Sequence, residues 1–362
     1  MEAMPNSSPK TLLIMAGGTG GHIFPALAVA SLLRAEGWHV LWFGNPNSME
    51  ERLAGQNGFE MIAVRFGAVR GKGVGRKLRL PFSIARAVWQ AIRAIRPARP
   101  DVVLGMGGYV SFPGGIAAKL LGIPLVIHEQ NAIAGLANRA LSRVANRTLT
   151  GFPDVLKKGE CVGNPVRAAI AQIPPPDERM AKREGALKLL VVGGSLGAKA
   201  LNDAIPAGLQ KLPPEQRPEV VHQAGEKHLE DLEANYQEYR KQGGVAHCVA
   251  FIEDMAGAYA WADLVICRSG ALTVSELATA GVAAILVPYP YHSDDQQTVN
   301  ARFLTAAGGA FLLQQTDLTP DAVALIGNYK RGQLVEMAKK ARELARPDAA
   351  LAVANVCRAS AK

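Results

Sequence analysis

Two glycine-rich segments of this chain each follow an apolar run and precede a predicted helix. The first is Gly17-Gly-Thr-Gly-Gly-His22, after the run 11–16, and the second is Gly193-Gly-Ser-Leu-Gly-Ala198, after the run 187–192. Glycine lets such a turn bring backbone N–H groups close to a ligand, and the N-terminus of the next helix favours negative charge. Both segments indicate phosphate binding. The alternative is that each is only a tight turn between a strand and a helix.

Neither segment has the full sequence of a common nucleotide-binding motif. A dinucleotide-binding fingerprint needs a third glycine where Ile23 stands, and an acidic residue where Asn45 follows the next predicted strand. The G-K-[ST] of a P-loop is missing from both segments. The sequence therefore argues against an NAD-dependent oxidoreductase and against a P-loop ATPase.

Predicted strands and helices alternate in two successive blocks. In the first block, glycines and polar residues end the strands that lead into Gly105-Met-Gly-Gly-Tyr109 and His128-Glu-Gln-Asn131. The strands predicted in the second block cover residues 187–192, 219–223, 245–251, 264–267 and 283–287. Ligands bind beyond the carboxyl ends of strands in open parallel sheets, so these ends hold candidate site residues. We predict an α/β fold of two Rossmann-like domains whose parallel sheets face a cleft.

The boundary between the two predicted domains follows residue 165. The first domain covers 1–165 and the second 166–344. The prolines Pro174-Pro-Pro176 and the charged stretch Asp177–Glu184 predict an interdomain linker.

The composition is that of a globular protein with two cores. The chain has 362 residues, of which 49% are hydrophobic and 20% charged. No apolar run approaches the length of a transmembrane helix, and the run 12–16 is too short for a signal-peptide core. The four scattered cysteines lack a C-x-x-C pair and are typical of reduced cytosolic thiols.

Positive charge is concentrated in one segment of the first domain. Residues 70–99 contain nine basic residues and no acidic one. On a helix, four of the residues there lie within about 40° of Phe82, which gives a face of aromatic and arginine side chains. That face consists of Phe82, Arg86, Trp89, Arg93 and Arg96. Such a mixture suits the interface of an anionic membrane. The alternatives are a solvated basic face and a nucleic-acid surface. No nucleic-acid-binding motif accompanies this face.

Seven short stretches together resemble one bacterial family, the undecaprenyldiphospho-muramoylpentapeptide β-N-acetylglucosaminyltransferases, which convert lipid I to lipid II in peptidoglycan synthesis. They occur in family order from near the first residue to about residue 300. The stretches are Gly17-Gly-Thr-Gly-Gly-His-Ile-Phe-Pro25, Gly105-Met-Gly-Gly-Tyr-Val-Ser111, His128-Glu-Gln-Asn131, Gly163-Asn-Pro-Val-Arg167, Gly193-Gly-Ser-Leu-Gly-Ala198, Arg268-Ser-Gly-Ala-Leu-Thr-Val-Ser-Glu276 and Asp295-Gln-Gln297.

The resemblance implies a GT-B fold and transfer of N-acetylglucosamine from UDP-N-acetylglucosamine to lipid I. It also implies peripheral attachment to the cytoplasmic face of the bacterial inner membrane. The second domain would bind the donor, and the first would bind the acceptor and anionic lipids. The last helix, about 345–362, would pack back on the first domain. We expect no cofactor, no metal and no nucleic-acid partner. The Asp-x-Asp motif that holds a metal in many nucleotide-sugar enzymes is missing from the sequence. Asp294 and Asp295 are adjacent and do not by themselves form this motif.

An inverting transfer by single displacement needs a base for the acceptor hydroxyl. His22 is one candidate, because the positive end of a helix dipole disfavours the imidazolium and leaves an imidazole able to accept a proton. Glu129 is the competing candidate. Either residue can instead make only a structural hydrogen bond.

The resemblance also assigns substrate contacts along both domains. Glu276 would accept hydrogen bonds from the ribose hydroxyls, although Thr273 and Glu276 also have the spacing of a helix capping box. Ile252 would lie beside the uracil, and Arg167 near the diphosphate. The other expected contacts are Thr19, Gly20, Gly21, Tyr109, Asn131, Ser195, Ala271, Leu272, Thr273, Val274, Ser275, Gln296 and Gln297.

Four other classes of protein share some of these features. A non-catalytic UDP-sugar-binding protein would bind UDP without turnover, and a UDP-sugar epimerase would release a free epimer and need no lipid. A glycosyltransferase acting on diacylglycerol would share the basic-aromatic face. An oxidoreductase would bind NAD, which the missing third glycine argues against.

Overall fold

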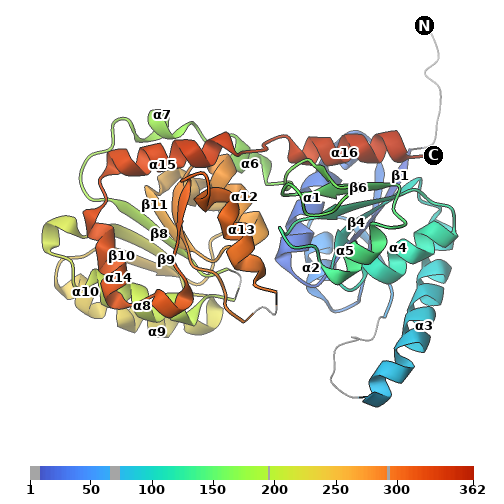
Figure 1. Cartoon of the computed structure of the whole chain (residues 1–362), viewed down its shortest axis with the longest axis horizontal. Coiled ribbons are helices and arrows are strands. Elements are labelled where there is room, and N and C mark those ends of the chain that lie inside the picture. The colour runs from blue at the N-terminus through green and yellow to red at the C-terminus, as the bar shows by residue number, and fades with distance from the viewer. Residues whose placement is uncertain (1–8, 66–73, 195, 292–293) are drawn as a thin grey trace, which may run out of the picture. The chain divides into compact units, whose positions relative to one another are not determined.

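The computed structural model describes residues 9–65, 74–194, 196–291 and 294–362, the side chains of residues 74–80 excepted. The chain divides into two compact units (Figure 1). The first unit is formed by Met1–Pro165 and Asp348–Lys362, and the second by Val166–Pro347.

A parallel sheet with the strand order β3-β2-β1-β4-β5-β6-β7 forms the centre of the first unit. Its strands are β1 (Thr11–Ala16), β2 (His39–Gly44), β3 (Glu60–Ala63), β4 (Val102–Gly107), β5 (Leu125–Glu129), β6 (Arg147–Thr150) and β7 (Glu160–Cys161). Its helices are α1 (Gly20–Ala35), α2 (Met49–Gln56), α3 (Val74–Ala98), α4 (Ser111–Leu120), α5 (Leu136–Leu141) and α16 (Ala349–Ser360). The strand order reverses between β1 and β4, where ligands bind in such sheets.

The second unit is built in the same way, with the parallel order β10-β9-β8-β11-β12-β13. Its strands are β8 (Lys188–Val192), β9 (Glu219–Gln223), β10 (Ala246–Val249), β11 (Leu264–Cys267), β12 (Ala283–Leu286) and β13 (Ala310–Leu312). Its α-helices are α6 (Ala168–Ala171), α7 (Pro176–Met180), α8 (Lys199–Leu209), α9 (Leu229–Asn235), α10 (Gln237–Lys241), α11 (Met255–Trp261), α12 (Ala271–Ala280), α13 (Gln296–Thr305), α14 (Pro320–Ala324) and α15 (Arg331–Glu343). Here the switch point lies between β8 and β11.

The apolar strands are buried on both faces, as continuous hydrophobic runs predict for parallel sheets. Successive side chains of β1 belong to two different cores, because side chains alternate across a strand. Leu12 and Ile14 pack against α1 and α16, whereas Leu13 and Met15 pack with residues of α3 and α4. The sheet is therefore covered by helices on both sides.

Helix α1 begins earlier than the position of Pro25 predicts, since proline is favoured in the first turn of a helix. Its first residue is Gly20, with Thr19 in an extended conformation before it, so Pro25 lies inside the helix instead of in its first turn. Proline has no backbone N–H, and the hydrogen bond that this group would make to the helix is missing at that point. The earlier start brings His22 into the first helical turn.

The predicted linker at 174–184 is wrong, because this segment belongs to the second unit. Arg179 donates hydrogen bonds to the carbonyls of Ala280 and Gly281. Arg183 forms a 2.6 Å ion pair with the buried carboxylate of Asp263. Proline-rich and charged composition gave no indication of these contacts, since their partners lie about 80–100 residues further along the chain.

Helix α16 packs against α1 within the first unit, through Val353, Ala354 and Cys357 (Figure 1). An ion pair between Arg358 and Glu36, at the end of α1, adds to this contact. The last helix is therefore part of the hydrophobic core of the first unit.

Candidate active site

His22 lies at the switch point of the first sheet. It is the third residue of α1, directly after the first glycine-rich loop, and the residue is partly exposed. Its Nδ1 lies 2.7 Å from Oε1 of Gln130, which follows the last residue of β5. In the same loop Thr19 and Gly21 are exposed and Gly20 is partly exposed. A ring held at one nitrogen can offer the other nitrogen to a substrate hydroxyl.

The buried carboxylate of Glu50, on α2, secures the first glycine-rich loop. Its Oε2 accepts a 3.3 Å hydrogen bond from the Gly18 N–H, so one N–H that could have bound phosphate is already used. Its Oε1 accepts a 2.5 Å hydrogen bond from the hydroxyl of Tyr109. Burial and this carboxylate raise the pKa of Tyr109. No sequence signal marks Glu50, because Gly18 and Tyr109 are 32 and 59 residues away in the chain.

Glu129 is buried and saturated with hydrogen bonds. Its Oε1 accepts from the backbone N–H of Asn131 at 2.9 Å and from the Asn131 side chain at 3.3 Å. Its Oε2 accepts from the Gly135 N–H at 3.0 Å and from Asn138 Nδ2 at 2.9 Å. These four donors occupy the carboxylate and order the loop that leads into α5. The geometry thus favours the structural role of Glu129 and leaves His22 as the better placed candidate for the base.

Gln223, the last residue of β9, supports the second glycine-rich loop. Its Oε1 accepts from the Gly193 N–H at 3.2 Å, and its Nε2 donates to the Gly194 carbonyl at 3.0 Å. Gly197 has a φ of +75°, and a Cβ there would collide with the carbonyl of Ala224. Sequence reasoning missed Gln223, although its place at a strand end could have indicated it. The predicted contact Ser195 lies outside the described residues.

Both carboxylate oxygens of Glu276, on α12, have partners inside the second unit. Oε1 accepts from Arg167 at 3.1 Å, and Oε2 accepts from the hydroxyl of Tyr259 at 3.1 Å. Burial raises the pKa of Glu276, and the Arg167 guanidinium opposes this rise. A carboxylate has about four lone-pair directions, so about two are not used by these partners, although only 5% of the side chain is exposed. Arg167 keeps 40% of its side chain exposed and can still meet an anion.

The alternative interpretation of Thr273 and Glu276 as a capping box is wrong. Helix α12 begins at Ala271 with Gly270 as its N-cap, so Thr273 is already inside the helix. Glu276 reaches away from the helix start to Arg167 instead.

The remaining predicted contacts on α12 differ in accessibility. Ala271 and Val274 are buried. Leu272, Thr273 and Ser275 are partly exposed, and the Ser275 hydroxyl donates to the Ala271 carbonyl at 3.0 Å.

Two neighbouring glutamines start α13. Gln297 accepts a 2.9 Å hydrogen bond from the backbone N–H of Tyr289, which supports the turn before the helix. Gln296 and Ile252 are partly exposed. Because β8, β11 and β12 are adjacent and parallel, the segments that follow them share one edge of the sheet. The structure therefore brings the second glycine-rich loop and the starts of α12 and α13 to the same edge.

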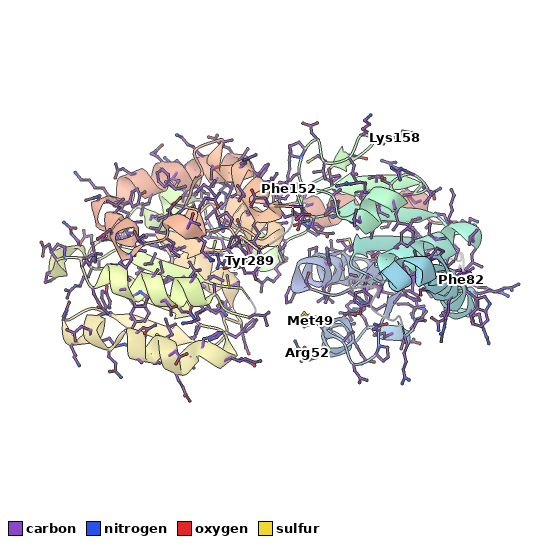
Figure 2. All side chains as sticks on the ribbon, turned by 60° about the horizontal axis from the view of Figure 1, so that its bottom comes forward. Met49, Arg52, Phe82, Phe152, Lys158 and Tyr289 are labelled. Carbon is purple, nitrogen blue, oxygen red and sulfur yellow. The ribbon has the colours of Figure 1, made fainter. Side chains whose placement is uncertain are left out.

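All five residues of the basic-aromatic face of α3 are exposed, and Figure 2 shows Phe82 projecting from the first unit. Phe82 is 80% exposed and Trp89 55%, and the Arg93 guanidinium lies 4.8 Å from the centre of the Trp89 ring. On the opposite side of the helix Ala91 and Ile95 are fully buried. Within the described part of the chain, every helix is too short or too polar to cross a bilayer.

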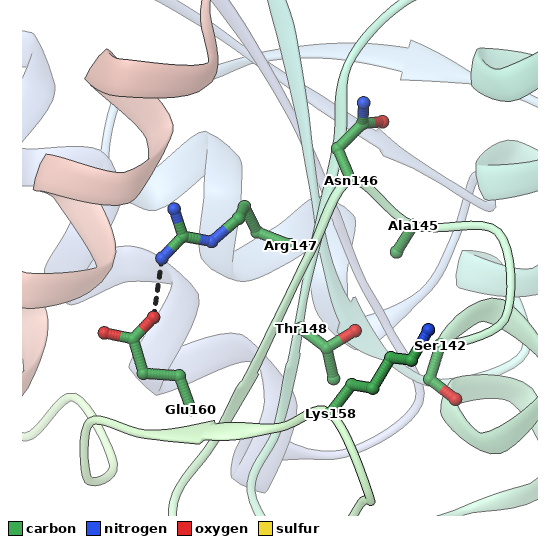
Figure 3. A pocket seen from close by; sticks show the side chains of 7 residues that line it. All are labelled: Ser142, Ala145, Asn146, Arg147, Thr148, Lys158 and Glu160. Carbon is green, nitrogen blue, oxygen red and sulfur yellow. Dashed lines mark hydrogen bonds and ion pairs between the residues drawn. The ribbon is translucent and has the colours of Figure 1, made fainter.

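One small pocket of about 130 Å³ lies beside β6 and β7, and the Arg147–Glu160 ion pair crosses its wall (Figure 3). None of the predicted site residues lines it, and it is too small for a nucleotide sugar. Its lining residues are Ser142, Ala145, Asn146, Arg147, Thr148, Lys158 and Glu160. Across the described residues, no three His, Cys, Asp or Glu side chains gather as a metal site requires.

Family matches cover most of the chain. Residues 12–150 match the glycosyltransferase family 28 N-terminal domain, and residues 188–353 match the glycosyltransferase family 28 C-terminal domain. The chain belongs to glycosyltransferase family 28.

Two relatives carry the name UDP-N-acetylglucosamine--N-acetylmuramyl-(pentapeptide) pyrophosphoryl-undecaprenol N-acetylglucosamine transferase. The one from Dechloromonas aromatica is 63% identical and covers 98% of this chain and 99% of the relative. The one from Ralstonia nicotianae is 57% identical and covers 98% and 97%. The crystal structure of Acinetobacter baumannii MurG aligns with a TM-score of 0.84 at 43% identity and covers 97% of this chain and 100% of that one.

These matches confirm the glycosyltransferase class and the GT-B type of α/β fold that the sequence predicts. They argue against the oxidoreductase interpretation, since family 28 enzymes transfer sugars. The glycine-rich loops of this family 28 chain are thus parts of a glycosyltransferase, and the predicted site residues other than Ser195 lie in the described parts of its two units.

Proposed function

We propose that this chain transfers N-acetylglucosamine from UDP-N-acetylglucosamine to the 4-hydroxyl of the N-acetylmuramoyl unit of lipid I, giving lipid II with inversion at the anomeric carbon. The observation that carries this proposal is the 63% identity, over nearly all of both chains, to a relative whose name states the transfer. The aligned region covers 98% of this chain, so both units take part in the match.

The first unit would bind the acceptor and supply the base. Supporting this, His22 stands at the switch point and is partly exposed, while the rival Glu129 already accepts four hydrogen bonds. His22 takes the proton of the attacking hydroxyl, whose oxygen forms the new bond to the anomeric carbon while UDP leaves with the electron pair of the broken bond.

The second unit would bind the donor. The second glycine-rich loop precedes α8, whose N-terminus favours the negative charge that develops on the departing diphosphate. Glu276 has lone pairs left for the ribose hydroxyls, and Ile252 and Gln296 are accessible for the base and the sugar. Tyr259, through its hydrogen bond, holds Glu276 in position.

A Glu276→Ala variant is expected to bind UDP more weakly by about 1–3 kcal/mol, because the ribose hydroxyls lose an acceptor. Isothermal calorimetry measures the affinity, and urea unfolding checks the fold. Tyr259→Phe is the matched control, because it removes a hydrogen bond to the same carboxylate without touching the ligand. If both variants lose UDP affinity and stability equally, Glu276 is structural and does not bind ribose.

Turnover is expected to continue without a divalent metal. The Asp-x-Asp motif is missing from the sequence, and the α8 N-terminus can stabilise the leaving diphosphate. The rate after exhaustive chelation by EDTA should equal the rate before it. A complete loss of activity that magnesium or manganese restores would contradict this expectation.

The exposed face of α3 would attach the enzyme to anionic lipids on the cytoplasmic side of the inner membrane. Arginines beside aromatic rings can reach lipid phosphates while the rings enter the headgroup region. The buried side of the same helix anchors the face to the domain. We propose peripheral attachment and no nucleic-acid partner.

A transfer assay tests the proposed function. The purified chain is incubated with radiolabelled UDP-N-acetylglucosamine and a lipid I analogue, and the lipid is extracted. Label in the extracted lipid supports the proposal. Label that stays water-soluble as an epimer of the donor would indicate an epimerase, and label that stays in unchanged donor would indicate a binding protein.

A further inference from the structure

We infer that Gln130 and His128 fix the tautomer of His22, so that its Nε2 carries the lone pair that accepts the substrate proton. This inference rests on the proposed role of His22 as the base. Gln130 and His128 are positioning residues, since neither needs to touch the substrate. The hydrogen bonds that connect these three side chains lie entirely within the first unit.

The chain of hydrogen bonds starts at a backbone carbonyl, which can only accept. Nε2 of His128 lies 2.9 Å from the carbonyl oxygen of Gly163, so this nitrogen carries a hydrogen. The His128 ring is fully buried, and burial lowers its pKa to about 4. At neutral pH the ring is therefore uncharged, and its Nδ1 has a lone pair.

The side-chain amide of Gln130 is oriented by two acceptors. Its Nε2 lies 3.0 Å from Nδ1 of His128 and 3.0 Å from the His128 carbonyl oxygen. A flipped amide would bring its oxygen against both of these acceptors. Asn164 donates a 3.0 Å hydrogen bond to the Gln130 carbonyl and fixes the backbone as well. The amide oxygen of the buried Gln130 must therefore point the other way.

That oxygen faces His22. Oε1 of Gln130 lies 2.7 Å from Nδ1 of His22 and can only accept, so Nδ1 must carry a hydrogen. In the neutral ring the lone pair then lies on Nε2. A histidine in water favours the other tautomer, with the hydrogen on Nε2. Without Gln130, the nitrogen that should accept the proton would more often carry one already.

Gly107, the last residue of β4, leaves the space that the ring needs. It has a φ of +102°, and a Cβ there would lie 2.9 Å from both Cε1 and Nδ1 of His22. The imidazole is thus held between a glycine and the amide of Gln130. The glycine at the end of β4 therefore leaves space for the imidazole, and Gln130, directly after β5, holds the ring by a hydrogen bond.

The hydrogen bond between His22 and Gln130 also suits the protonated form of His22. When Nε2 takes the hydroxyl proton, the O–H bond breaks and an N–H bond forms, and the oxygen keeps its electron pair for the sugar. His22 is then an imidazolium with two donors, and its Nδ1–H still faces the Gln130 oxygen. That hydrogen bond becomes charge-assisted, so no reorientation is needed during the reaction.

Nitrogen-15 NMR of the full chain labelled in its histidines tests this inference directly. The His22 signals are assigned from their disappearance in His22→Ala. We expect the wild-type ring to have a protonated Nδ1 and an unprotonated Nε2. In Gln130→Leu the signals should move toward the Nε2–H tautomer, whereas Gln56→Leu, the same change at an exposed position of the same unit, should leave them unchanged. A wild-type ring protonated on Nε2, or an unaltered tautomer in Gln130→Leu, would overturn the inference.

Kinetics separate this inference from the role of His22 itself. Gln130→Leu should lower kcat by about ten- to a hundredfold, the usual effect of losing a group that orients a functional histidine, with the KM for the donor unchanged. In a His22→Ala background the same substitution should have no further effect. A further loss there would show that Gln130 acts elsewhere. Full activity of His22→Ala would show that His22 is not the base. The NMR experiment would still show which nitrogen of His22 carries the hydrogen.

Discussion

The His22→Ala variant is expected to turn over about 10²- to 10⁴-fold more slowly than the parent, the usual range for a lost general base. Its affinity for UDP should change little, because His22 belongs to the first unit and the proposed donor residues belong to the second. Steady-state kinetics with a soluble lipid I analogue, together with calorimetry for UDP, measure both quantities.

His39→Ala is the control for this variant, since His39 is an exposed histidine at the start of β2 in the same unit. It should keep the parental rate. A loss of less than tenfold in a folded His22→Ala protein would remove His22 from the role of base. The proton would then pass to Glu129 or to the substrate itself, and Glu129 would first have to release some of its four donors.

A triple variant with Trp89→Ala, Arg86→Glu and Arg93→Glu is expected to lose binding to anionic vesicles. Each basic residue near the surface contributes about 1 kcal/mol, and reversing two of them adds repulsion to the lost attraction. Activity on the long-chain lipid acceptor in membranes should fall with the binding. Activity on a short water-soluble acceptor should remain, because Ala91 and Ile95 still anchor the helix to the core.

Vesicle sedimentation at low and high salt measures this effect, since salt screens the attraction. The control carries Lys157→Glu and Lys158→Glu, two charge reversals at exposed positions of the same unit. It should sediment with vesicles as the parent does. Equal sedimentation of the triple variant and the parent would exclude this face of α3 as the membrane site.

Strands such as β1, β8 and β11 could be predicted from the sequence because they are largely apolar runs. The predicted strands 219–223 and 264–267 coincide with β9 and β11. The start of α1 and the segment 174–184 could not be predicted in the same way. In α1 the first turn contains glycines and precedes Pro25, residue types that do not indicate a helix. Arg179 and Arg183 bind partners that only the tertiary fold brings near.

Only part of the candidate site could be predicted from the sequence. The motifs indicated His22, Glu129 and Glu276, whose residue types suit the chemistry. The residues that orient or restrain them, such as Gln130 and Tyr259, are ordinary in type and become informative only through their contacts. Glu129 has a residue type that suits the chemistry, but its carboxylate already accepts four hydrogen bonds, which the sequence does not indicate.

The most direct test of the proposed transfer is the structure of the product. The purified chain is incubated with UDP-N-acetylglucosamine and a short-chain lipid I analogue, and the purified product is examined by mass spectrometry and NMR. We expect an acceptor heavier by one N-acetylhexosamine residue, joined through a β linkage to the 4-hydroxyl of the muramoyl sugar. An α linkage, another acceptor position, or an unchanged acceptor beside an epimerised donor would contradict it.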